Sequence, residues 1–149
     1  MSGQENLEGQ ASRTGLEAFK GILDYMSDSF VRAYIFVEVV PADFAYEIAQ
    51  SNEITEKEKA GLLQSLGEIG NMLELLKTGY DNGWGIKFLD DPDNVKKFTA
   101  IMSRLIALYK GFKDGTMIKA TELSLAIADV AYDLRGFFIS YMKTINMPG

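Results

Sequence analysis

The chain has 149 residues, no cysteine, no histidine and a formal net charge of −6. Without histidine, Ser-His-Asp and Cys-His catalysis, ordinary zinc sites and Glu-x-x-His di-iron bundles are excluded. Without cysteine, disulfides and thiol chemistry are excluded as well. The acidic balance and the lack of any Lys/Arg cluster argue against a nucleic-acid partner.

The length and the 47% hydrophobic content fit one folded domain with its own core. Residues 1–13 are polar and rich in Gly and Gln, and we expect them to form a mobile arm ahead of a single helical domain at 14–149. The N-terminus lacks the basic and apolar regions of a secretory signal, and no stretch is apolar enough to cross a bilayer. We therefore expect a cytoplasmic protein.

The first long helix is predicted from Thr14 to Pro41. Thr14 and Glu17 have the spacing of a capping box, and Pro41 cannot continue a helix. Between them, apolar residues recur in steps of three and four, as on one face of a helix: Leu16, Phe19, Leu23, Met26, Phe30, Ala33, Val37 and Val40. Residues 31–40 are also rich in β-branched side chains, so a strand is the alternative there.

A short connecting helix is predicted at 42–50 and a long one from about Thr55 to Tyr80. Thr55 and Glu58 again have capping-box spacing. Three glycines interrupt the long helix, which indicates close approach of a neighbouring helix, with a bound ligand as the alternative: Gly61, Gly67 and Gly70.

Residues 81–91 form the one substantial predicted loop, with Trp84 between two glycines. Exposed Trp is common in binding hot spots, and the alternative is that Trp84 fills the end of the bundle. Asp91 and Pro92 predict the start of another long helix. After a turn at 114–115, the last helix is expected from near Thr116 to about 145.

These elements predict an all-α fold, an up-down-up-down bundle of four long helices plus one short connecting helix. Short connections should place sequence neighbours antiparallel and side by side.

Two pairs of aspartates have i, i+4 spacing on the first and last helices: Asp24 with Asp28, and Asp129 with Asp133. If the pairs met, their carboxylates could hold Mg²⁺ and orient a phosphate substrate. Solvated aspartates explain the same pattern, since Asp28 also has Arg32 four residues on. We expect the solvated arrangement and no cofactor, with a Mg²⁺-dependent enzyme as an alternative.

Apolar residues off the core faces favour a non-enzymatic protein-binding module, such as an adaptor, inhibitor or assembly subunit. We expect it to self-associate as a homo-oligomer, because a helix that is apolar nearly all round must be buried nearly all round. An apolar-ligand or membrane-associating bundle is the first alternative. It is suggested by the same apolar residues off the core faces, together with Ile139. The candidate interface residues are Tyr34, Ile35, Phe36, Val39, Trp84, Phe138 and Met142.

Overall fold

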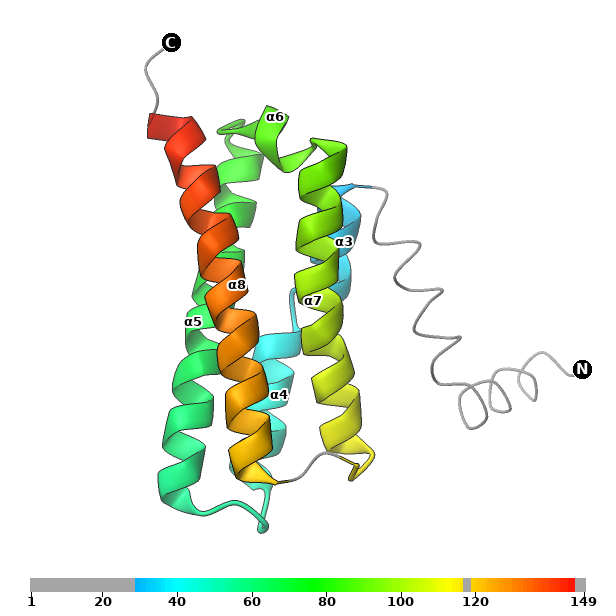
Figure 1. Cartoon of the computed structure of the whole chain (residues 1–149), viewed down its shortest axis with the longest axis vertical. Coiled ribbons are helices and arrows are strands. Elements are labelled where there is room, and N and C mark those ends of the chain that lie inside the picture. The colour runs from blue at the N-terminus through cyan, green and yellow to red at the C-terminus, as the bar shows by residue number, and fades with distance from the viewer. Residues whose placement is uncertain (1–28, 117–118, 147–149) are drawn as a thin grey trace, which may run out of the picture.

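The computed structural model describes residues 29–116 and 119–146, and these residues form an all-α bundle without strands (Figure 1). The fold class predicted from the sequence is thus confirmed. The helices are α3 (Phe30–Val37), α4 (Val40–Gln50), α5 (Glu56–Asp81), α6 (Ile86–Leu89), α7 (Pro92–Lys113) and α8 (Ala120–Asn146).

The bundle has four columns, with α3 and α4 following one another in the first. That column packs on α5 and on α7, and both of these pack on α8. The α3–α4 column and α8 therefore occupy diagonal corners. Figure 1 shows α5 and α8 running in the same direction and α7 running against them.

The expectation that all sequence neighbours pack side by side is wrong for α5 and α7. Within the described residues these two helices share no substantial contact, because α8 and the first column lie between them. The connection through α6 crosses the end of the bundle and is long enough to reach the diagonal corner. Packing of α6 against α7 and α8 holds the connection at that end.

A continuous helix from 14 to 40 is also wrong. Ser29 is extended (φ −164°, ψ 161°), and its hydroxyl accepts a hydrogen bond from the Arg32 backbone N–H at 3.2 Å. A serine side chain in this position caps the first turn of a helix, so α3 begins at Phe30. The strand alternative fails too, since Phe30–Val37 is helical. The predicted arm at 1–13 and helical segment at 14–28 lie outside the described residues.

The predicted helix end at Pro41 is wrong, because α3 already ends at Val37 and Pro41 lies inside the first turn of α4. A proline is accommodated there because the first N–H groups of a helix have no partner within the helix. The predicted short helix at 42–50 is confirmed, with its start two residues earlier.

Local capping signals are confirmed with their hydrogen bonds. The Glu58 N–H donates to the Thr55 hydroxyl at 3.2 Å, and the Thr55 N–H donates to the Glu58 carboxylate at 2.9 Å. Asp91 caps α7 by accepting from the N–H groups of residues 93 and 94 at 3.2 and 3.3 Å. The predicted loop at 81–91 differs from expectation in containing α6.

Aromatic side chains join the columns near the α6 end. The ring centroid of Phe98 on α7 lies 5.0 Å from that of Phe30 on α3 and 5.6 Å from that of Phe137 on α8. Phe30 also stacks on Tyr80 of α5 at 5.3 Å. Such ring pairs add to the stability gained from apolar burial, so this cluster fixes how the columns meet.

Candidate protein-binding face

The outward side of α8 carries a line of large apolar side chains. We call Leu125, Tyr132 and Ile139 the outer stripe; they are seven residues apart and 66%, 69% and 48% exposed. Seven residues are close to two helical turns, so the three side chains fall on one line along the helix. A surface helix ordinarily presents polar residues on the side away from its core.

The opposite side of α8 packs into the bundle core. Its buried residues follow the predicted stripe: Leu123, Ile127, Val130, Leu134, Phe137 and Tyr141. The helix therefore has two apolar faces, and the bundle covers one of them. The exposed apolar side chains of α8 make this side of the helix a candidate for a contact outside the bundle.

Small residues lie beside the outer stripe and leave it accessible. Ala128 and Gly136 are exposed, and a Cβ placed on Gly136 would meet nothing within 4 Å. An approaching helix could therefore come close to the α8 backbone between the three large side chains.

A groove between α7 and α8 adjoins the outer stripe. Its volume is about 760 Å³, Ile101 and Phe137 contribute apolar surface, and Tyr132 and Ile139 also line it. A second hollow of about 320 Å³ continues along the same two helices and shares Arg104 with the first. Together they extend the candidate face along much of α7 and α8.

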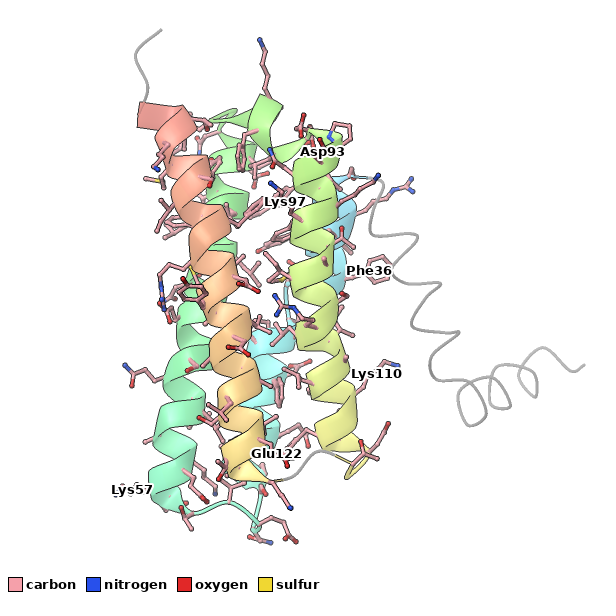
Figure 2. All side chains as sticks on the ribbon, in the orientation of Figure 1. Phe36, Lys57, Asp93, Lys97, Lys110 and Glu122 are labelled. Atoms are coloured by element: carbon pink, nitrogen blue, oxygen red, sulfur yellow. The ribbon has the colours of Figure 1, made fainter. Side chains whose placement is uncertain are left out.

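Two ion pairs flank the stripe and tie α8 to its neighbours. Arg104 of α7 binds Asp133, and Arg135 donates to Glu68 of α5 at 2.6 Å. Lys97 also lines the groove, on the side of α7 that faces α8 (Figure 2). Within the described part of the chain its ammonium group forms no ion pair.

The residues predicted as an interface do not form one surface. Ile35, Val39 and Trp84 are each more than half exposed. The other four are half-buried and pack against the core, namely Tyr34, Phe36, Phe138 and Met142. Ile35 and Val39 belong to the corner diagonal to α8, so they lie apart from the outer stripe.

Trp84 does not fill the end of the bundle. Its side chain is 53% exposed, whereas the Tyr141 ring is buried at that end. A Cβ on Gly79 would lie 1.8 Å from the Tyr141 Oη, and one on Gly85 would lie 2.6 Å from its Cε1. Tyr141 thus fills a slot whose walls are two glycines, and burial raises its pKa.

Two of the four candidate aspartates, Asp129 and Asp133, belong to the described residues. Asp129 is exposed, and Asp133 is bound to Arg104. Asp24 and Asp28 lie outside the described residues. Within residues 29–116 and 119–146, no three acidic side chains gather in a way that could hold a metal ion.

Leu125 and Tyr132 were missed as candidate residues in the sequence. The signal for them was the seven-residue spacing of Leu125, Tyr132 and Ile139. The core stripe by itself already predicts α8 as an amphipathic helix, so this second spacing does not stand out in the sequence.

No protein-family model, curated protein sequence or solved structure matches this chain. None of the described helices has the length and apolar character needed to cross a membrane.

Proposed function

We propose that this chain is a non-enzymatic protein-binding module that binds a helix of its partner along the outer stripe of α8. The observation that carries the proposal is the alignment of Leu125, Tyr132 and Ile139 on the solvent side of a helix whose other face is fully used by the core. Covering apolar surface contributes about 25 cal/mol for each Å² removed from water, so a partner with a matching stripe gains stability from this face.

The groove between α7 and α8 supports the same proposal. An amphipathic partner helix presents apolar side chains at i, i+3 or i+4, and i+7, and the seven-residue interval is that of the outer stripe. Lys97 in the groove would favour a partner with a carboxylate on that flank, since opposite charges set orientation and register at interfaces.

Site-specific photo-crosslinking tests the proposal. A benzophenone amino acid replaces Tyr132 in the full chain, which is then irradiated in its native cells. Matched chains carry the same probe at Tyr46 on α4 or at Ile35 on α3, both also exposed. We expect discrete protein adducts at position 132, and weaker adducts at the other two positions.

Adding Ile139→Glu to the Tyr132 probe should remove the adducts while the helical circular dichroism stays the same, because Ile139 is half exposed. Adducts of equal strength at all three positions, or adducts that survive Ile139→Glu, would overturn the proposal.

A further inference from the structure

We infer that the partner of the outer stripe is a second copy of this chain, bound through an antiparallel pair of α8 helices with the two-fold axis at Tyr132. This inference rests on the proposed function and names its partner. Leu125 and Ile139 each lie seven residues from Tyr132. In an antiparallel pair centred there, Leu125 of each copy lies level with Ile139 of the other, and the two Tyr132 side chains meet at the axis.

The small residues fit the same arrangement. Ala128 and Gly136 each lie four residues from Tyr132, on opposite sides of it along the chain. The two-fold axis places Ala128 of each copy level with Gly136 of the other. Both residues are exposed, and a Cβ on Gly136 would meet nothing within 4 Å. The two helices can therefore approach closely on either side of the Tyr132 pair.

The charged residues of α8 favour a second copy as the partner and an antiparallel direction for the helix pair. Glu122 precedes Leu125 by one turn, and Lys143 follows Ile139 by one turn. Both are exposed, and neither forms an ion pair within the described residues. Glu122 lies near the first turn of α8 (Figure 2). The antiparallel pair brings Glu122 of each copy beside Lys143 of the other, which forms two opposite-charge contacts.

Nearer the axis, Arg135 already donates to Glu68 of its own chain, so Glu122 and Lys143 carry the opposite-charge contacts between the copies. A parallel pair would instead set Glu122 against Glu122 and Lys143 against Lys143. Like charges opposite each other disfavour that alternative.

The contact is one pair of helices over about 30 Å, from Glu122 to Lys143 at about 1.5 Å per residue. That is small for a permanent interface, so we expect a dimer that dissociates on dilution through the micromolar range. Sedimentation equilibrium of the full chain should show monomer and dimer exchanging with concentration. A monomer at every concentration up to hundreds of micromolar would overturn the inference.

Because the chain has no cysteine, single introduced cysteines report the geometry directly. Under mild oxidation, Tyr132→Cys alone should form a disulfide-linked dimer. Leu125→Cys alone should not, whereas a mixture of Leu125→Cys and Ile139→Cys chains should give the mixed dimer. Ile35→Cys, on the diagonal corner, is the matched control. Rapid self-linking of Leu125→Cys would show a parallel pair, and faster linking through Ile35→Cys would place the interface elsewhere; either result overturns the inference.

Charge reversal provides a readout that a loss of folding would not reproduce. Glu122→Lys and Lys143→Glu should each weaken the dimer several-fold, and the double reversal should restore it. Failure of the double reversal to recover dimerisation would contradict the predicted pairing. If the purified chain stays monomeric but the Tyr132 probe captures a different protein in cells, the proposed function stands and the second copy is not the partner.

Discussion

The Tyr141 hydroxyl donates a hydrogen bond to the backbone carbonyl of Trp84 at 2.8 Å, which ties α8 to the connection that follows α5. The Trp84 N–H donates in turn to the Gly79 carbonyl at 2.8 Å, and the preceding residue, Gly83, has φ +82°. This is the hydrogen-bonding pattern of a glycine-terminated helix. The end of α5 and the position of Tyr141 therefore depend on each other.

We predict that Gly79→Ala destabilises the protein by about 2 kcal/mol or more, because an added methyl group would overlap the buried Tyr141 hydroxyl. Gly67→Ala in the same helix is the matched control. Nothing lies within 4 Å of a Cβ there, so higher helix propensity should stabilise the protein by up to about 1 kcal/mol. Urea unfolding measures both changes, and equal effects of the two substitutions would contradict the tight slot around Tyr141.

Tyr141→Phe should cost about 1 kcal/mol, since the ring packing remains but the Trp84 carbonyl loses its donor. The same substitution removes the atom closest to an added methyl group at position 79. Gly79→Ala should therefore cost less in the Tyr141→Phe background than in the native chain. A double-mutant cycle measures this coupling, and strictly additive costs would show that the hydroxyl is not the obstacle.

Alkaline pH should destabilise the bundle through its buried tyrosines. Burial raises the pKa of Tyr141, and burial followed by a hydrogen bond to Asp90 raises the pKa of Tyr80. A raised folded-state pKa means that the stabilising neutral form is fully present below the unfolded pKa of about 10 and is lost as the pH rises above it. Urea unfolding at a series of pH values should show stability falling above about pH 10.

In that experiment Tyr141→Phe should lose less stability with rising pH than the native chain does. Tyr46→Phe, which alters an exposed ring on α4, should follow the native curve. An unchanged slope in Tyr141→Phe would mean that other groups, such as Tyr80, account for the alkaline loss.

Local signals in the sequence predicted the helix ends well. The Thr55 box and the Asp91 cap each depend on hydrogen bonds between residues within three positions, so they can be identified without the fold. The role of Gly79 could not be identified in this way, because the side chain that needs its space comes from α8. Gly61 and Gly67 resemble it in sequence but have open space around them, so the predicted close helix approach is wrong there. Gly70 does meet a neighbour, with Pro41 Cβ 3.5 Å from an added Cβ.

The candidate face was harder to predict than the core. Phe36 and Phe138 lie off the core stripes and for that reason predict an interface, yet both pack partly against the core. A heptad stripe is narrower than the face that a bundle helix buries, so neighbours of the stripe are covered as well. The additional apolar side chains of α8 could be recognised only once the fold showed that Leu125 and Tyr132 are exposed.

The last prediction concerns the acidic pair on α8. Asp129→Asn should change stability by no more than about 0.5 kcal/mol, because the side chain is exposed. Asp133→Asn should cost up to about 1 kcal/mol, because it weakens the ion pair with Arg104 between α7 and α8.

Thermal unfolding of the native chain should not shift with millimolar Mg²⁺, since an ion that binds only the folded state must raise the melting temperature. A Mg²⁺-dependent rise that disappears in Asp129→Asn would instead support the Mg²⁺-dependent enzyme over the binding module.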